Sequence, residues 1–421
     1  MSSLSRSDLP AELRSFIAAD VERRFLEYVQ IHTTSDPNSS SNPSSACQLE
    51  LVEQLERELK GMGLTDVFRD QYGYLYARLA GRSRGEAIGL LAHVDTSPDQ
   101  PGDGVKPQVH RDWDGSAILF PEDAELRLTK ETCPELYAFI GDSIITASGR
   151  TLLGADDKAG VAEIMSLVAA LIEFKKLPHT DLVVCFTHDE EIGRGILGLD
   201  LSRLPRACYT VDGGLPGSLE VECFDAHAVD IQIEGVGVHP GYAKGRMINA
   251  AVLASRLVSM LPQGDTPERS DGREGFWHLT GIQGDHERAT LSFILRDFAR
   301  EKNLERIRAF DRACQFLQES VPGAKLTMKA RQQYENMKGV LDKAPEVVER
   351  ARFAIRRAGL TLQEVPIRGG TDGSLLSAAG HPTPNLFAGG VLFHSRREWI
   401  ALSSMVSAVE TLIRLVKPFP E

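Results

Sequence analysis

The sequence of 421 residues lacks the features that would place it in a membrane or on a nucleic acid. Its longest apolar stretch, residues 161–174, contains Glu163 and is too short to cross a bilayer. The first 20 residues have no apolar core of the signal-peptide type, so we expect no export. Lys and Arg (47) are outnumbered by Asp and Glu (59), giving a net charge of -12, whereas binding phosphates needs a basic face. We expect no membrane and no nucleic acid as a partner.

Cysteine is also scarce. The six cysteines show no Cys-x-x-Cys spacing, and most of them lie in apolar runs. We therefore expect buried free thiols, as in a protein of the reducing cytoplasm.

The pattern of apolar residues indicates two domains. The chain is too long for one ordinary core. Buried strands predicted near 87–92, 181–187, 207–211 and 384–387 alternate with helices at 158–174 and 403–415, which is typical of an α/β domain with a mostly parallel mixed sheet. Residues 226–233 and part of 289–296 alternate with period two, and helices fit 249–261 and 304–320. We predict an α/β domain over 1–220 and 335–421, interrupted by an α+β domain over 221–334 with the order two strands, helix, two strands, helix.

Two further helices are expected near the N-terminus, at 20–29 and 49–62. The loop between them, residues 35–45, is rich in Ser, Pro and Asn, so we expect a mobile connection.

Asp156 and Asp157 stand directly before the long apolar helix. Two adjacent carboxylates in that place either cap the helix, because Asp accepts hydrogen bonds from free N–H groups, or hold a cation. The pair by itself favours the cap.

Other acids and histidines follow predicted strands. In an open α/β sheet the carboxyl ends of parallel strands share one edge, so residues far apart in sequence meet there. Four or five carboxylates at such an edge would repel each other unless cations were bound. The candidate side chains offer imidazoles and carboxylates but no thiolate, which suits catalytic Zn²⁺, with Co²⁺ or Mn²⁺ possible. The residues are His93, Asp95, Asp156, Asp157, Glu190, Glu191, Asp212 and His394.

Local geometry divides these residues by role. Residues two apart in a strand point the same way, so Asp95 can accept a hydrogen bond from the far ring nitrogen of His93. Glu190 and Glu191 point apart if extended, so one can be a ligand and the other a general base. Each motif alone can be explained without a site, as a surface pair, a solvated loop or a turn. We predict a site because all of the motifs follow strands of one sheet.

The chain resembles the co-catalytic zinc metallopeptidases related to carboxypeptidase G2, and within them the peptidase T group of tripeptide aminopeptidases. The resemblance covers nearly the whole chain in order. The matching segments are 93–99, 151–160, 189–193, 210–214, 238–241, 274–278, 368–373 and 384–387.

The resemblance implies a site with two metal ions, zinc in this family. Asp156 would bridge them, with His93 and Asp212 completing one metal site and Glu191 and His394 the other. Glu190 would be the general base. Asp95 would support catalysis by contacting a metal ligand without binding a metal itself. The expected activity is hydrolysis of the N-terminal peptide bond of tripeptides.

The resemblance also implies that the inserted domain is a lid that forms a homodimer. His239 would polarise the scissile carbonyl, although the residue alone is most simply a turn residue before Pro240. Arg296 and Arg368 would bind the backbone or carboxylate of a short peptide substrate, for which the bidentate fork of Arg is suited.

Two segments depart from the family pattern. His188 stands where a Pro usually precedes Asp-Glu-Glu, and residues 391–395 replace a more polar run. Neither change removes a ligand. The alternatives to a tripeptide aminopeptidase are a related di-zinc hydrolase of dipeptides or N-acyl amino acids, and a peptide-binding homologue without catalysis.

Overall fold

The computed structural model describes residues 9–419, and the chain divides into two compact units. The larger unit comprises Met1–Val221, Val340–Val365 and Thr371–Glu421, and the smaller unit comprises Glu222–Gly339 and Pro366–Gly370. Among the described residues, no helix is long and apolar enough to cross a membrane.

The larger unit is built on an eight-stranded mixed sheet with the order β1-β2-β8-β3-β9-β16-β10-β15. Its four central neighbours, β8, β3, β9 and β16, run parallel, and they are almost wholly buried because helices or loops cover both faces. The predicted α/β class with a mostly parallel mixed sheet is confirmed. The strands are β1 (Asp66–Arg69), β2 (Leu75–Leu79), β8 (Leu182–Thr187), β3 (Ile88–His93), β9 (Ala207–Gly213), β16 (Asn385–Phe387), β10 (Ser218–Glu220) and β15 (Gln363–Glu364).

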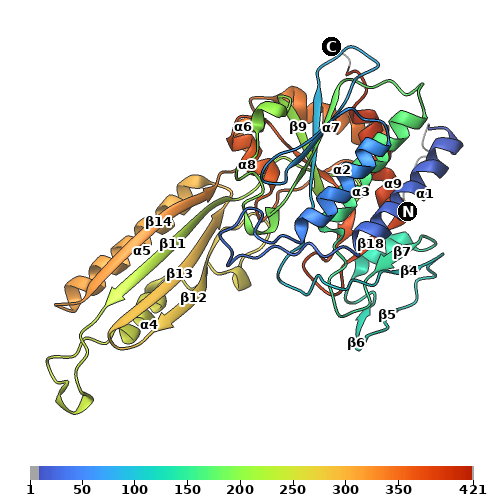
Figure 1. Cartoon of the computed structure of the whole chain (residues 1–421). Coiled ribbons are helices and arrows are strands. Elements are labelled where there is room, and N and C mark those ends of the chain that lie inside the picture. Colours follow the sequence, from blue (N-terminus) through green and yellow to red (C-terminus); the bar gives the residue numbers. More distant parts are fainter. Residues whose placement is uncertain (1–8, 420–421) are drawn as a thin grey trace. The chain divides into compact units, whose positions relative to one another are not determined.

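Helices α1 (Ala11–Tyr28), α3 (Ala155–Glu173) and α9 (Leu402–Leu415) pack against one another, and α3 lies against β3 and β9 (Figure 1). Helix α1 begins well before the predicted residue 20, because Leu13 and Ile17 continue its buried apolar stripe by further turns. The remaining helices of this unit are α2 (Gln48–Gly61), α7 (Pro345–Arg357) and α8 (Asp372–Ala378). The short helix α6 (Lys338–Leu341) lies in sequence where the chain passes between the two units.

A second, four-stranded sheet in the larger unit has the order β17-β18-β7-β4. It packs around the buried Trp399 together with Trp113 and the hairpin β5-β6. Strands of two to six residues carry little periodicity, so the sequence pattern did not reveal this sheet. The strands are β4 (Gln108–His110), β5 (Ile118–Phe120), β6 (Asp123–Leu128), β7 (Ile144–Thr146), β17 (Gly390–Val391) and β18 (Trp399–Ala401).

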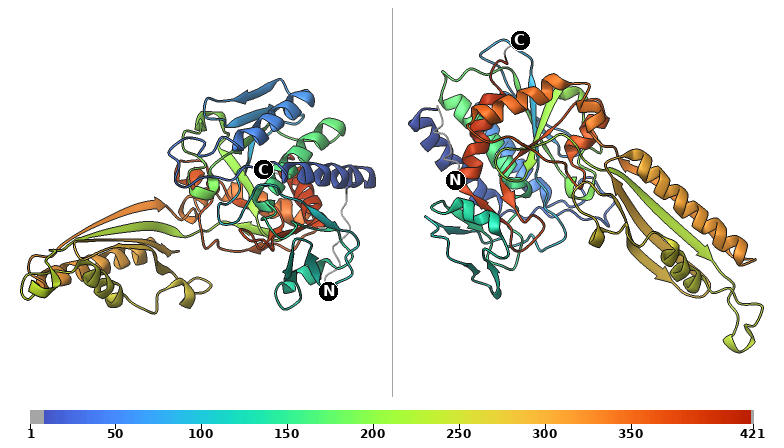
Figure 2. Two further views of the ribbon diagram at one scale, coloured as in Figure 1. Left: turned by 60° about the horizontal axis from the view of Figure 1, so that its bottom comes forward. Right: turned by 180° about the vertical axis from the view of Figure 1, so that it is seen from behind.

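The smaller unit is a four-stranded antiparallel sheet, β12-β13-β11-β14, with helices α4 and α5 on one face (Figure 2). Its core lies between that face and the helices, with Phe293, Phe310 and Trp277 at the centre. The predicted order of two strands, helix, two strands, helix is wrong. One strand precedes α4 and one follows α5: β11 (Asp225–Glu234), α4 (Ala250–Met260), β12 (Phe276–Gly284), β13 (Arg288–Asp297), α5 (Arg300–Ser320) and β14 (Lys325–Tyr334).

The cysteines have the predicted state. All six are free thiols, and all but the half-buried Cys47 are buried.

The contact between α3 and β9 depends on a missing side chain at Gly160. A Cβ atom added there would lie 1.8 Å from the main-chain oxygen of Val211 and 2.5 Å from Oδ1 of Asp157. The first atom belongs to the main chain, and the Asp157 side chain is buried and held by the N–H of His93, so neither can move aside easily. We predict that Gly160→Ala lowers the free energy of unfolding by about 3 kcal/mol, since α3 must move away from the strand.

Gly61→Ala is the matched control, because Gly61 ends α2 with open space around its Cα and Ala is the better helix former. Urea titration of both variants checks the prediction. Equal stability of the two would contradict the close approach of α3 to β9.

Candidate active site

The strand ends bring most of the predicted residues to one edge of the main sheet. His93 is the last residue of β3, and Asp212 lies near the end of the neighbouring β9. Glu190 and Glu191 begin the short 3-10 turn Glu190–Ile192, which His188 and Asp189 connect to the end of β8. Asp156 stands in the first turn of α3, between β7 and the regular part of the helix.

His394 reaches the same place from the second sheet. It lies in the connection between β17 and β18, with a main-chain φ of 56°. A residue other than glycine seldom adopts this left-handed conformation, and those that do are often found at functional sites. The tight turn directs the His394 ring toward Asp156 and Glu191.

Two groups of three potential metal ligands share Asp156, and we call them the donor groups. In the first, Nε2 of His93 lies 3.0 Å from Oδ1 of Asp156 and 3.6 Å from Oδ1 of Asp212. In the second, Nε2 of His394 lies 3.2 Å from Oδ2 of Asp156 and 2.8 Å from Oε2 of Glu191. The donor atoms of each group all lie within 4.8 Å of one another. The two oxygens of Asp156 thus serve different groups.

The helix cap and the donor role belong to different members of the aspartate pair. Oδ1 of Asp157 accepts the N–H of Gly160 at 3.2 Å, which is the hydrogen bond of an N-cap residue. Oδ2 of Asp157 accepts the N–H of His93 at 3.2 Å. The peptide bond between Asp156 and Asp157 is cis. Asp157 therefore caps the helix and ties it to β3, and Asp156 is left for the donor groups.

Asp95 acts mainly on the main chain of the glutamate pair. Its carboxylate accepts the N–H of Glu190 at 3.0 Å and that of Glu191 at 3.2 Å. Nδ1 of His93 lies 3.0 Å from the main-chain oxygen of Asp95 and 3.3 Å from its Oδ1. The contact expected between His93 and Asp95 is present, but the main-chain oxygen is the closer acceptor. Asp95 thereby fixes both the His93 ring and the turn of the two glutamates.

The Glu190 carboxylate lies near the donor groups but belongs to neither of them. Within residues 9–419 it forms no hydrogen bond and no ion pair, although the residue is partly buried. Burial raises the pKa of Glu190 well above its usual range, and the nearby carboxylate of Asp212 adds to the rise. A carboxylate with a raised pKa and a free lone pair suits a general base.

Two residues that position the site were not singled out from the sequence. Glu398 is buried, and its carboxylate accepts the N–H groups of Leu153, Gly154 and Asp156 at 2.8, 2.8 and 3.0 Å. Asn385 accepts the N–H of Asp212 at 3.2 Å. The residues act on main-chain groups of distant segments, so spacing along the sequence gives no signal for them.

Two divalent cations fit the donor groups. Three carboxylates face only two imidazoles, and Oε1 of Glu191 is buried without a hydrogen-bond partner among the described residues. Burial, with the charge of Asp156 added, raises the pKa of Asp212 to about 7 and that of Glu191 to about 8. Cations would relieve this excess of negative charge, and carboxylate and imidazole are ligands that catalytic zinc and related metals take.

The other three predicted residues lie in the smaller unit. Nδ1 of the exposed His239 accepts the N–H of Gly241 at 3.2 Å, which leaves Nε2 as the donor of the neutral ring. Arg296 donates to Oε1 of Gln333 at 2.8 Å and to main-chain oxygens. Arg368 donates to the main-chain oxygens of Gly272 and Glu274 at 2.7 and 2.9 Å.

Neither arginine forms an ion pair with a carboxylate in the described part of the chain. Each guanidinium also lies over an aromatic ring, that of Tyr334 for Arg296 and that of Phe224 for Arg368. Their positive charges are therefore oriented but not neutralised, which suits the binding of an anionic group.

The fold and the donor groups are those of a metallopeptidase, and comparison with known proteins gives the family. The model of peptidase family M20/M25/M40 matches residues 152–417. The chain belongs to this family and is a metal-dependent peptidase, which confirms the resemblance seen in the sequence.

Among curated relatives, "Peptidase T" of Bacillus subtilis (strain 168) is 42% identical over 403 residues, covering 95% of this chain and 98% of the relative. "Peptidase T" of Caldanaerobacter subterraneus subsp. tengcongensis is 41% identical over 402 residues, covering 94% and 98%. The fold matches the solved aminopeptidase PepT of Bacillus cereus with a TM-score of 0.74 at 22% identity, covering 95% of this chain and 98% of that one.

The charge of the donor groups predicts how stability depends on pH and metal. In the metal-free protein the pKa values of Asp212 (about 7) and Glu191 (about 8) exceed those of carboxyls in an unfolded chain, about 4. Between pH 5 and 8 the folded chain then binds more protons than the unfolded one. The free energy of unfolding therefore falls as pH rises across this window. Metal ions need the deprotonated groups, so the stabilisation by Zn²⁺ should grow over the same window.

Calorimetry of chelator-treated protein from pH 5 to 8, with and without Zn²⁺, measures both effects as melting temperatures. Asp212→Asn serves as the comparison, because it removes one titrating ligand and should reduce the pH slope and the Zn²⁺ shift together. A melting temperature of the metal-free protein that rises with pH would contradict the prediction.

Proposed function

We propose that this chain is an aminopeptidase that releases the N-terminal residue of tripeptides with the help of two metal ions, zinc in the first instance and Co²⁺ or Mn²⁺ as alternatives. The observation that carries the proposal is the pair of donor groups sharing Asp156, with the unpaired Glu190 carboxylate beside them. The printed names of the relatives, "Peptidase T" and, for a solved structure from Staphylococcus aureus, "a tripeptidase", support the substrate class.

His93, Asp156 and Asp212 would hold one metal ion, and Asp156, Glu191 and His394 the other. When bound, such ions polarise a carbonyl group and lower the pKa of water. The protein holds the ligand-bearing segments in place through the hydrogen bonds that Asp95, Asp157 and Glu398 accept from main-chain N–H groups.

Glu190 would take the proton from the attacking water. Its carboxylate then carries that proton to the nitrogen of the leaving amine, so the same residue acts first as a base and then as an acid. Asp95 supports the transfer by fixing the main chain of Glu190 and Glu191. Removing Asp95 would therefore loosen the base and a ligand at once.

The smaller unit would supply substrate recognition as a lid and the contact of a homodimer. Arg296 and Arg368 have uncompensated positive charges and would bind the carboxylate or backbone of the peptide. His239 would donate from Nε2 to the carbonyl oxygen of the bond to be cut. We place this activity in the cytoplasm, because the six cysteines are free thiols, as is usual for proteins of a reducing compartment.

A panel of peptides tests the substrate class. We expect the metal-loaded protein to cleave tripeptides with free N-termini and to release the first residue, with rates on dipeptides, tetrapeptides and acetylated tripeptides at least about tenfold lower in kcat/KM. Chromatography of the products shows which bond is cut. A preference for acetylated peptides or dipeptides would replace the aminopeptidase with one of the related hydrolases.

Glu190→Gln tests the general base. The amide keeps the size of the side chain but cannot accept the proton, so kcat should fall by about 10²–10⁴-fold. Metal content and melting temperature should stay those of the parent. Glu305→Gln, on the exposed face of α5, is the matched control and should retain full activity. Unchanged turnover in Glu190→Gln would rule out the assigned role.

A further inference from the structure

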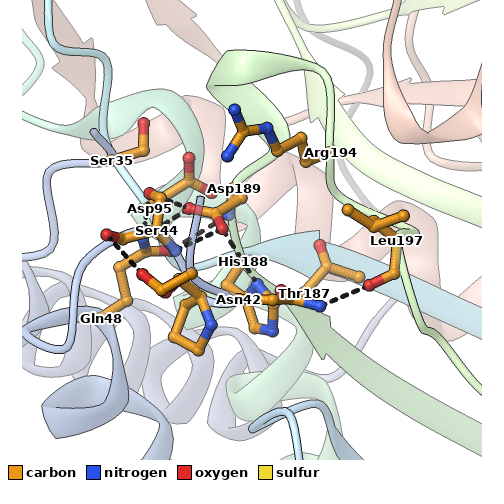
Figure 3. Close-up of polar contacts among 12 residues, drawn as sticks. Ser35, Asn42, Ser44, Gln48, Asp95, Thr187, His188, Asp189, Arg194 and Leu197 are labelled. Carbon is orange, nitrogen blue, oxygen red and sulfur yellow. Dashed lines mark hydrogen bonds and ion pairs between the residues drawn. The ribbon is translucent and has the colours of Figure 1, made fainter. Parts of the chain in front are cut away.

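The loop between α1 and α2 is fastened to the segment that carries Glu190 and Glu191. We call residues 33–47 the anchor loop. It contains residues 35–45, whose Ser, Pro and Asn content led us to expect a mobile connection, and hydrogen bonds join it to other segments. Arg194 donates to the main-chain oxygen of Ser39 at 2.7 Å, and Asn42 donates to that of Leu197 at 2.6 Å. The loop therefore contacts the segment that follows the glutamate turn, and Figure 3 shows the contact of Asn42 with Leu197.

The centre of these contacts is Asp189, the residue before Glu190. It is fully buried and its main chain has a φ of 59°. Asp tolerates this left-handed conformation better than most residues, but holding it there still requires stabilising contacts. The orientation of Asp189 decides the direction in which the chain enters the 3-10 turn of Glu190 and Glu191.

Ser44 and Gln48 supply those contacts. The N–H of Ser44 donates to Oδ2 of Asp189 at 2.6 Å, and its hydroxyl donates to Oδ1. Gln48, the first residue of α2, donates from Nε2 to Oδ1 at 2.7 Å and accepts the main-chain N–H of Asp189 on Oε1 at 3.1 Å. One amide side chain thus holds both the carboxylate and the main chain of Asp189, and all three residues are buried (Figure 3).

The anchor loop also pairs with the segment that follows His93. The N–H of Thr96 donates to the main-chain oxygen of Thr33, and the N–H of Ser35 donates to that of Thr96, both at 3.2 Å. Asp95, the neighbour of Thr96, accepts the N–H groups of Glu190 and Glu191. The loop therefore joins the two segments that must stay in register if His93 and Glu191 are to keep their places in the two donor groups, with Glu190 beside them.

We propose that Gln48 and Ser44 are positioning residues for catalysis: through Asp189 they set the orientation of Glu190 as general base and of Glu191 as metal ligand. This inference rests on the proposed function. Neither residue belongs to the donor groups, and their effect passes through the main chain of Asp189.

The primary test is Gln48→Ala, compared with Gln54→Ala on the same helix, where the Gln54 side chain donates to Glu58 at 3.0 Å. We expect Gln48→Ala to lower kcat on a tripeptide and the affinity for Zn²⁺ by about 10–100-fold each, as outer contacts of metal sites do. KM should change less than about threefold, because no group that touches substrate is altered. Gln54→Ala should leave kcat, KM and the Zn²⁺ affinity unchanged.

An exchange of groups separates positioning from mere stability. Gln48→Glu alone places a second carboxylate against Asp189 and should reduce kcat. Combined with Asp189→Asn, the asparagine can donate to the glutamate at position 48, and the buried network again carries one negative charge. We expect the double variant to recover kcat to within about fivefold of the parent, whereas each single variant stays lower.

Several results would overturn the proposal. One is a Gln48→Ala protein with a lower melting temperature but with the parent's kcat per metal-loaded site and the parent's Zn²⁺ affinity, since a purely structural role predicts that result. Another is a double variant that recovers nothing although it folds and binds Zn²⁺.

If Gln48→Ala does not fold, Ser44→Ala takes its place, because it removes one hydroxyl donor and keeps the main-chain N–H. It should lower kcat and Zn²⁺ affinity in the same pattern with a smaller amplitude, and parental values would overturn the proposal. If the parent cleaves no peptide, the proposed function fails, and the Zn²⁺ titrations of the same variants still decide whether the loop positions Glu191.

Discussion

The sharing of Asp156 between two donor groups is the constraint on which the rest of the larger unit depends. One oxygen of this carboxylate faces His93 and Asp212, and the other faces His394 and Glu191. A carboxylate can serve both groups only if its main chain is held in one orientation. Burial, with the charge of Asp156 added, raises the pKa of Asp212 and of Glu191, so three carboxylates at this short range are costly to ionise together. Metal ions complete an arrangement that the protein alone leaves with an excess of negative charge.

The protein meets the need for orientation with one repeated device: a buried side chain accepts main-chain N–H groups of a segment that carries a ligand. Glu398 holds the segment before Asp156 in this way, and Asp157 holds the end of β3 at His93. Asp95 and Asn385 do the same for the glutamate turn and for Asp212. Each hydrogen bond is modest alone, but a buried N–H without a partner costs about 1–3 kcal/mol, so the set specifies one geometry. The anchor loop acts one step further from the ligands, because it holds Asp189, the residue before Glu190.

The smaller unit has a different physical character. Its sheet buries one face against α4 and α5, and its chemistry lies in side chains that are oriented but not neutralised. Arg296 and Arg368 are held by carbonyl and amide oxygens, which cannot cancel a positive charge as a carboxylate would. The exposed His239 has one ring nitrogen engaged within its own turn. Side chains with these properties are suited to binding a charged or polar ligand.

The sequence by itself determined the class of fold, the family and the candidate donors, because buried strands, amphipathic helices and acids at strand ends leave periodic and local patterns. Apolar runs such as 88–93 and 182–187 can be seen without coordinates, and so can the residues that follow them. The tertiary structure decided which aspartate caps α3, where the strands of the smaller unit fall, and which segments the anchor loop contacts. It also revealed Glu398, Asn385 and Gln48. These residues act through hydrogen bonds between segments 140 or more positions apart in the chain, and such contacts arise only when the sheet brings its strand ends together.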